Sequence, residues 1–128
     1  KETLSELQGK QAKLIEDAFS GFAEKMNAAL PEGEVYFTIA DEKVEFGWKI
    51  GDSKRPFKAL SGGERVAFDM ALAYSLQAGL IIKECAELDP KRLGLVLEKF
   101  LEVPTQTIVV TCHPPAETPK GWAVINAV

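Results

Sequence analysis

The most informative stretch of the chain reads Leu60-Ser61-Gly62-Gly63-Glu64, and it leads into an alanine-rich segment. Ser61 is placed as an N-cap residue, and Glu64 follows three positions later, the spacing of a Ser-x-x-Glu capping box. A helix that begins here points its free N–H groups and the positive end of its dipole outward, and glycines leave room for an anion beside them. The stretch predicts a phosphate-binding helix start. A capped helix with a Gly-Gly entry turn and no ligand explains these residues equally well.

The residues that follow continue the helical pattern. The face expected to be buried carries Val66, Met70, Ala73, Tyr74 and Gln77. Three- and four-residue steps place these positions on one side of a helix, and the alanines allow close packing against a sheet. Gly79 is expected to end the helix.

Two apolar segments further along predict buried strands, at residues 80–82 and 107–112. Asp89 and Pro90 lie between them and have the residue types of an N-cap and a first helical position, so we expect a helix that continues through Leu101. A crossover helix of this kind makes the two strands parallel neighbours. The sequence therefore predicts a strand-helix-strand unit.

Polar residues follow both predicted strands. Lys83 and Glu84 follow the first strand, and His113 follows the second. Because the carboxyl ends of parallel strands lie at one edge of a sheet, Glu84 and His113 should lie at the same edge, where ligand sites are common. On its own, a single histidine at a strand end is more often structural.

The order of these motifs resembles the C-terminal lobe of the ATPase head in ABC ATPases of the SMC and RecN type, which act in DNA repair. The resemblance implies an α/β fold, the C-terminal lobe of an ABC-type P-loop ATPase head. Such a lobe contains the end of a coiled-coil arm, a β-hairpin, a signature helix and a small, largely parallel sheet flanked by helices. In that family the signature motif of one head completes the nucleotide site of the opposing head, and Ser61, Gly62, Gly63 and Glu64 match that motif.

The resemblance also implies roles for three further residues. Asp89 matches the D-loop residue beside the nucleotide, and His113 matches the switch histidine that contacts the γ-phosphate. Glu84 matches the glutamate that orients and activates the attacking water. On this reading Glu84 and His113 are the catalytic residues, and no residue is assigned with certainty to a metal.

The strand before Glu84 departs from the Walker B pattern, in which an Asp-Glu pair ends the strand. Lys83 stands where the metal-associated aspartate is expected, and the spacing from Glu84 to Asp89 is one residue shorter than usual. A second alignment makes Glu84 the metal-side carboxylate and leaves Cys85 at the water-activating position. That alignment predicts slow or absent hydrolysis, and both alignments remain open at this stage.

The sequence has no Walker A loop of the form Gly-x-x-x-x-Gly-Lys-Ser/Thr. We therefore expect the isolated chain to bind ATP weakly, to need no cofactor and to be inactive. In the complete protein we expect ATP and Mg²⁺, an N-terminal Walker A lobe upstream or on another chain, and a second head as a homodimer partner. DNA would be contacted through the assembled protein.

Two other functional readings follow from the same residues. In the first, the lobe has lost hydrolysis and serves as a structural or protein-interaction module, with Lys83 in place of the missing metal charge. In the second, the chain is a small thiol enzyme that uses Cys85 or Cys112 with His113. The pair of Cys112 and His113 is disfavoured because adjacent strand residues point to opposite faces.

Composition agrees with one domain that has a single core. The chain has 128 residues, 46% of them hydrophobic, and a formal net charge of -4. Its scattered Lys and Arg residues argue against a broad nucleic-acid surface. No apolar run approaches the roughly twenty residues that cross a bilayer, so we expect a cytoplasmic protein without membrane contact. We interpret the only two cysteines as reduced, partly buried thiols.

The N-terminal third predicts a helix and then a hairpin. Residues 2–30 have the period of one amphipathic helix, which is either an ordinary core helix or, by resemblance, the end of a coiled-coil arm at residues 1–32. The lobe then spans residues 33–128. A β-hairpin is expected from strands at 35–39 and 44–50. Residues 51–56 read as a solvated loop, whose Lys54-Arg55 pair could alternatively touch phosphate, and residues 122–128 read as a final strand at the sheet margin.

Overall fold

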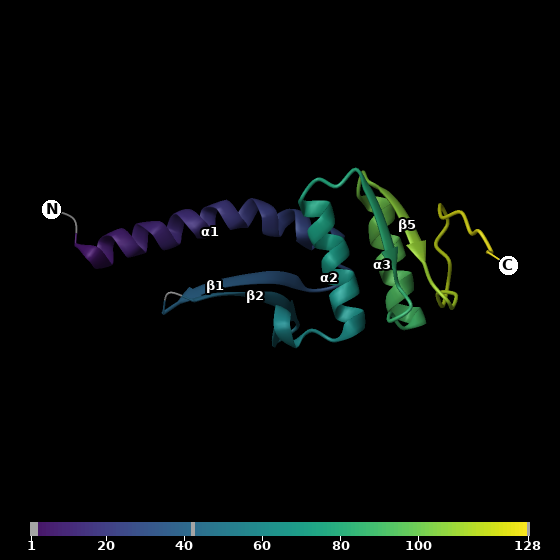
Figure 1. Cartoon of the computed structure of the whole chain (residues 1–128), viewed down its shortest axis with the longest axis horizontal. Helices are drawn as coiled ribbons and strands as arrows, with labels where there is room; N and C mark the ends of the chain where they lie inside the picture. The colour runs from purple at the N-terminus through teal and green to yellow at the C-terminus, as the bar shows by residue number, and fades with distance from the viewer. Residues whose placement is uncertain (1–2, 42, 128) are drawn as a thin grey trace.

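A long helix, α1 (Leu4–Ala29), projects from one end of the molecule (Figure 1). The computed structural model describes residues 3–41 and 43–127. Thr3 caps α1 in a full capping box with Glu6, and the last turn ends at Leu30, whose N–H donates to the Met26 carbonyl oxygen. The helix predicted over residues 2–30 is confirmed within the described part of the chain. Its final turn, unlike its first turns, is buried.

An antiparallel sheet of three strands lies beside α1 in the order β1 (Glu34–Ala40), β2 (Lys43–Ile50) and β3 (Ser53–Pro56). The predicted hairpin is confirmed, and Val35 lies opposite Trp48 in its register. Stacking of Phe19 on Phe37, with ring centroids 4.2 Å apart, fixes α1 against β1.

The prediction of a loop at residues 51–56 is wrong, because residues 53–56 form β3. Only a short turn at Gly51, with a φ of 58°, separates β2 from β3. Glycine adopts this left-handed conformation readily, so the chain reverses at once and residues 53–56 pair with β2. The polar sequence of β3 lacks an alternating apolar pattern because it forms an edge strand, and this is why periodicity did not identify it.

Helix α2 (Gly62–Ser75) follows a short 3-10 turn, η1 (Phe57–Ala59). It ends before the predicted Gln77 and Gly79. The N–H of Gln77 donates to the Tyr74 carbonyl and the N–H of Ala78 to the Ala73 carbonyl, which is the bond pattern of a Schellman motif. Gln77 occupies the left-handed position with a φ of 62°, so a residue other than glycine ends this helix.

The predicted strand-helix-strand unit is confirmed as β4 (Leu80–Glu84), α3 (Pro90–Glu102) and β5 (Gln106–Val110). The two strands pair in parallel, and their carboxyl ends meet where Glu84 lies opposite Val110. Asp89 caps α3 by accepting a hydrogen bond of 2.8 Å from the N–H of Arg92.

The final strand predicted at residues 122–128 is wrong for residues 122–127, and Val128 lies outside the described residues. The indole of Trp122 donates a hydrogen bond of 2.8 Å to the Leu97 carbonyl, so the segment is held against α3. Val124 and Ile125 are exposed. The apolar, β-branched composition was a sound strand signal, but this segment pairs with neither β4 nor β5.

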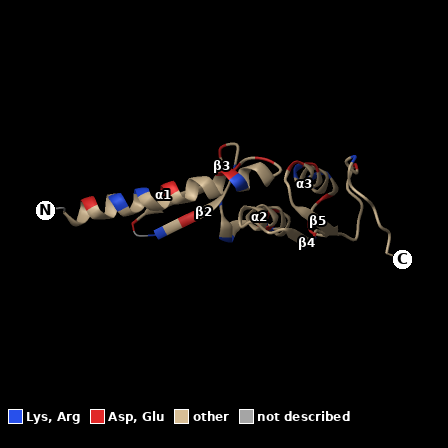
Figure 2. Ribbon diagram, turned by 90° about the horizontal axis from the view of Figure 1, so that it is seen from above, with Lys and Arg blue, Asp and Glu red and all other residues tan. Residues whose placement is uncertain are grey.

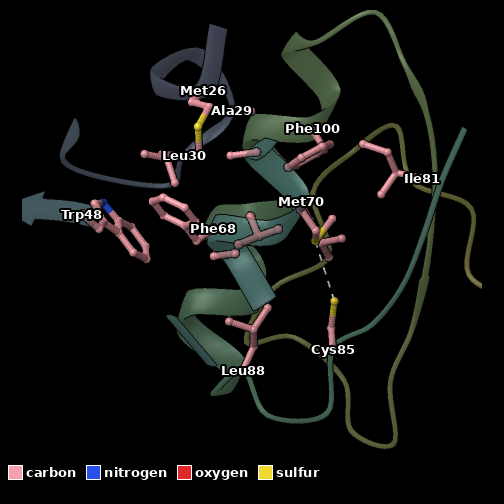
Figure 3. Packing of buried hydrophobic residues seen from close by; sticks show 14 of the residues in the cluster. Met26, Ala29, Leu30, Trp48, Phe68, Met70, Ile81, Cys85, Leu88 and Phe100 are labelled. Carbon is pink, nitrogen blue, oxygen red and sulfur yellow. Dashed lines mark hydrogen bonds between the residues drawn. The ribbon is translucent and has the colours of Figure 1, made fainter. Parts of the chain in front are cut away.

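A single core joins the end of α1, the antiparallel sheet, α2 and the strand-helix-strand unit (Figure 3). Its largest fully buried side chains include Trp48 from β2, Phe68 and Met70 from α2, and Leu88 from the loop after β4. Helix α2 lies at the centre and has six buried residues. Within the described residues, no helix combines the length and the apolar content needed to cross a bilayer.

Candidate functional site

The start of α2 is built by its capping residue. Ser61 has an extended backbone, with a φ of -64° and a ψ of 166°, and its Oγ accepts a hydrogen bond of 3.3 Å from the N–H of Glu64. The N–H groups of Gly62 and Gly63 belong to the first turn, where no intrahelical acceptor exists. The predicted N-cap is therefore present, with two amides beside it that can bind an anion.

The predicted capping box is only half formed. The Glu64 carboxylate does not return to the Ser61 backbone; it accepts a hydrogen bond of 2.9 Å from the Ser61 hydroxyl and one of 2.6 Å from the Arg55 guanidinium. Glu64 is only 7% exposed, although it is charged. The predicted contact fails because the Glu64 carboxylate pairs with Arg55 of β3 instead of the Ser61 backbone.

The environment of Glu64 has opposing effects on its acidity. Burial alone raises the pKa of this carboxyl, but the hydrogen bonds from Arg55 and Ser61 and the charges of Arg55 and Arg92 lower it more, so the net pKa lies below its ordinary value. Glu64 is therefore ionised at neutral pH despite its burial.

The loop between β4 and α3 packs directly on the two glycines. A Cβ atom on Gly62 would collide with the Glu87 carboxylate, and one on Gly63 would lie 2.8 Å from the Glu87 carbonyl oxygen. The neighbour of Gly63 is backbone, so only glycine allows the loop to approach this closely there, whereas at Gly62 the flexible Glu87 side chain can move aside. Gly62 and Glu87 both line two open hollows, of about 500 Å³ and about 440 Å³, so the hollows adjoin at these two residues.

The first hollow contains the two charged residues at the end of β4. Glu84 is exposed there, and its Oε1 accepts a hydrogen bond of 2.6 Å from the N–H of Ala86. The Lys83 ammonium lies 3.2 Å from the Asp69 carboxylate of α2. Lys83 is thus committed to an ion pair within the lobe, and Glu84 is the carboxylate at the end of β4.

The second hollow contains the residue matched to the D-loop. Asp89 lines it together with Ser61, Gly63 and Arg92. The N–H of Arg92 is the main cause of a lowered pKa at the Asp89 carboxyl, because hydrogen bonds to a carboxylate favour its charged form. The Arg92 guanidinium also lies 3.4 Å from the carboxylate of Glu32, which follows α1.

His113 reaches the same loop from the end of β5. Its Nε2 lies 3.1 Å from the Ala86 carbonyl oxygen, and its backbone N–H donates to Thr111 Oγ1 over 3.3 Å. Glu84 and His113 therefore contact the same residue, Ala86, one through its N–H and the other through its carbonyl. The expectation that the carboxyl ends of β4 and β5 bring Glu84 and His113 together is confirmed.

The two cysteines differ from the sequence prediction and from each other. Cys85 is fully buried beside Met70, with 3.9 Å between the sulfur atoms, whereas Cys112 is exposed. Burial, reinforced by the charge of Glu84 and partly offset by that of Lys83, raises the pKa of Cys85 to about 11. Cys85 is therefore protonated at neutral pH, which argues against it as a nucleophile or as a water-activating base.

The predicted site residues other than Glu64 lie in or around the loop of residues 84–89, whereas Glu64 pairs with Arg55 of β3. The sequence prediction missed Arg55 and Glu87. Arg55 was visible as half of a Lys-Arg pair, but its partner Glu64 is supplied by the tertiary fold. Within the described part of the chain, no three His, Cys, Asp or Glu side chains are arranged to hold a metal ion.

Comparison with known proteins gives a structural likeness without a sequence match. No protein-family profile and no curated protein matches the chain. Its structure superimposes on an SMC ATPase solved in work on ATP-driven dimerisation and DNA-stimulated activation, with a TM-score of 0.54 and 21% identity over 82% of this chain and 73% of the other. The chain has the fold of part of an SMC head.

A second SMC head, solved in complex with the C-terminal winged-helix domain of ScpA, shows the same likeness. It gives a TM-score of 0.50 and 22% identity over 73% of this chain, and it is matched over 34% of its own length. The SMC-head fold of this chain therefore corresponds to about a third of that larger structure. The α/β class, the β-hairpin and the small parallel sheet predicted from the sequence are confirmed.

Proposed function

We propose that this chain is the signature-motif lobe of an ATP-driven, dimerising head in an SMC-like ATPase of DNA repair or chromosome maintenance. Its α2 start would complete the nucleotide site of an opposing head, and pairing of two such heads would move their arms. ATP would act as the bridge between the heads. The RecN-like assignment and a cytoplasmic location are part of this proposal.

One observation carries the proposal. The capped Gly62-Gly63 helix start, the Glu84–Asp89 loop and His113 come from three separate parts of the sequence and meet in one place. Each matches a motif of the SMC and RecN head lobe: the helix start would serve the nucleotide site of the opposing head, and Glu84 would serve the site of its own head. Independent motifs that converge on one loop are stronger support than a helix N-terminus alone.

The residues fit the γ-phosphate end of a nucleotide presented by a partner. Gly62 and Gly63 would donate backbone N–H bonds to this phosphate, and Ser61, whose side chain Glu64 holds, would cap the helix beside it. Asp89 would face the partner beside the nucleotide, and His113 would contact the γ-phosphate of the nucleotide bound by its own head. That nucleotide would supply the reactive phosphoryl group together with its Mg²⁺, and Glu84 would hold the attacking water in the site of its own head.

The Walker A lobe of the same head would cover an apolar face of the parallel sheet. Four side chains on the same face of β4 and β5 are exposed, namely Leu80, Ile82, Ile108 and Val110. A two-stranded sheet with one open apolar face is marginal alone, so a neighbouring layer is expected. We propose the Walker A lobe as that layer. The SMC head bound to ScpA is much larger than this chain, since only 34% of its length is matched.

Helix α1 has the features expected of an arm end. Leu4, Leu7 and Leu14 are exposed on it, while its last turn enters the core. In Figure 2, acidic and basic residues are interspersed along α1, and no basic stripe marks a DNA surface there. We propose that a second helix pairs with α1, that residues 1–32 are the arm end and 33–128 the lobe, and that DNA is contacted by the assembled protein.

The test is ATP-dependent pairing of the complete protein, followed by analytical ultracentrifugation. Ser61→Arg should abolish pairing because it places a bulky cation where the partner's nucleotide would dock. Thr3→Arg is the matched control, since it removes the cap of α1 with the same substituent and should leave pairing intact. Normal pairing of the Ser61 variant would remove the signature assignment.

A second candidate function, a lobe that binds nucleotide without hydrolysis, is favoured by one observation. In the alignment that makes Glu84 the catalytic glutamate, Lys83 replaces the metal-associated aspartate, and its ammonium pairs with Asp69. ATP turnover by the complete protein decides between the two. Turnover that is lost in Glu84→Gln supports a hydrolysing head, and turnover that is absent in both proteins supports the binding lobe.

A further inference from the structure

Arg55 lies at the end of a chain of hydrogen bonds that reaches the proposed site. Its guanidinium donates to Glu64 Oε2 over 2.6 Å, and Glu64 Oε1 accepts from the Ser61 hydroxyl over 2.9 Å. Ser61 Oγ also accepts from the N–H of Glu64. The serine side chain is therefore held through both of its hydrogen-bonding functions, and one of these depends on where the carboxylate lies.

The alternative position of this carboxylate is visible elsewhere in the molecule. At the start of α1, Glu6 turns back and accepts a hydrogen bond of 2.8 Å from the backbone N–H of Thr3. Nothing in the local sequence of α2 prevents Glu64 from doing the same, since both motifs have the Ser/Thr-x-x-Glu spacing. The difference is the guanidinium of Arg55, which draws the carboxylate away from the backbone.

Arg55 is itself held in place by the sheet. It lies on β3 directly opposite Trp48 of β2, which is fully buried. A charge-assisted bond from a residue on a paired strand is more rigid than one from a loop. The orientation of the carboxylate is therefore imposed by the antiparallel sheet that also packs on α1.

We propose that Arg55 is a positioning residue that sets the rotamer of the Ser61 hydroxyl through Glu64 and thereby prepares α2 to receive a nucleotide phosphate. The inference rests on the proposed function of that helix start. It assigns to an edge strand of the hairpin sheet a part in ATP-driven head pairing. Arg55 does not touch the nucleotide in this arrangement.

A double-mutant cycle on the complete protein tests the link. Arg55→Gln should weaken ATP-driven pairing about tenfold, the size expected for one charge-assisted hydrogen bond. In a Ser61→Ala background the same change should have no further effect, because the hydroxyl that Arg55 orients is gone. Equal losses in both backgrounds would show that Arg55 acts by another route and would overturn the proposal.

Two further variants separate positioning from a general effect on the fold. Arg55→Lys retains a charge that can reach Glu64 and should recover pairing to within about threefold of the wild type. Lys54→Gln changes the neighbouring residue on β3, whose ammonium lies 5.4 Å from the centre of the Tyr36 ring, and should leave pairing unchanged. Equal losses in Arg55→Lys and Arg55→Gln would contradict the charge-assisted contact.

Thermal unfolding of the four proteins in the cycle gives an answer that does not depend on pairing. Coupled changes in Tm between Arg55 and Ser61 support the link, and additive changes overturn it. If the wild type shows no ATP-driven pairing, the proposed function fails while the unfolding cycle still decides whether Arg55 positions Ser61.

Discussion

Helices α1 and α2 begin with the same local motif but end up with different contacts. Thr3 and Glu6 of α1 close a full capping box, in which each side chain satisfies the backbone of the other. Ser61 and Glu64 of α2 form half of that box, and the glutamate pairs with Arg55 from β3. An identical spacing thus produces a self-contained cap at an exposed helix end in α1 and a tertiary polar cluster around a buried glutamate in α2.

The difference shows what surroundings add to a sequence motif. The start of α1 is exposed, so its glutamate has water and its own backbone as partners. The start of α2 lies between β3 and the loop after β4, where a buried carboxylate must be paired to avoid a large desolvation cost. Burial therefore directs the glutamate of α2 away from the backbone and toward the serine hydroxyl.

The packing side of this comparison is tested by Phe68→Ala in α2 and Leu14→Ala in α1. Phe68 is fully buried, so its loss should lower the free energy of unfolding by about 3–5 kcal/mol. Leu14 is 70% exposed, and its loss in this chain should cost less than about 0.5 kcal/mol. Urea denaturation measures both, and similar losses would show that α1 is packed more tightly than its exposure indicates.

The capping side is tested by removing each glutamate in turn. Glu64→Ala breaks two side-chain hydrogen bonds in a buried position and should lower the free energy of unfolding by about 2 kcal/mol. Glu6→Ala removes an exposed capping contact and should cost about 0.5 kcal/mol. The comparison fails if the two alanine variants lose the same stability.

The buried carboxylate of Glu64 should make the stability of the chain depend on pH in the acid range. The pKa of Glu64 is lower in the folded chain than in the unfolded chain, so the unfolded state binds more protons and stability falls as the pH decreases. The loss begins near the unfolded value of about 4.3 and continues toward the lowered folded value. Glu64→Gln should lose less stability over this window. Asp89 titrates in both proteins, so their difference isolates Glu64, and parallel curves would argue against its ionisation.

The smallest effect is expected from removing the Glu87 carboxylate, which the loop after β4 places at the start of α2. Glu87 lies against Gly62, so an incoming phosphate must displace or tolerate its charge. In the complete protein, Glu87→Gln should strengthen ATP-driven pairing by about two- to fivefold, the size of a helix-terminus charge effect. Glu98→Gln, on the exposed side of α3, is the control and should not change pairing. Weaker pairing in the Glu87 variant would indicate that this carboxylate assists docking.

Much of the fold and of the candidate site followed from local patterns. The caps at Ser61 and Asp89, the hairpin and the strand-helix-strand unit were predicted because each depends on residues close together in the chain. The failures have a common origin. Strand β3 has no apolar period because it is an edge, and residues 122–127 have a strand composition but are held to α3 by Trp122.

The sequence by itself determined where the helices begin and which residue types stand at the candidate site, because capping and periodicity act over three or four residues. Only the tertiary structure decided that Glu64 pairs with Arg55, that Glu87 lies on Gly62, and that Glu84 and His113 share Ala86. These contacts join segments far apart in the chain or separated by a turn. They form because burial in one core requires each charged or polar group to find a partner at the place to which the fold brings it.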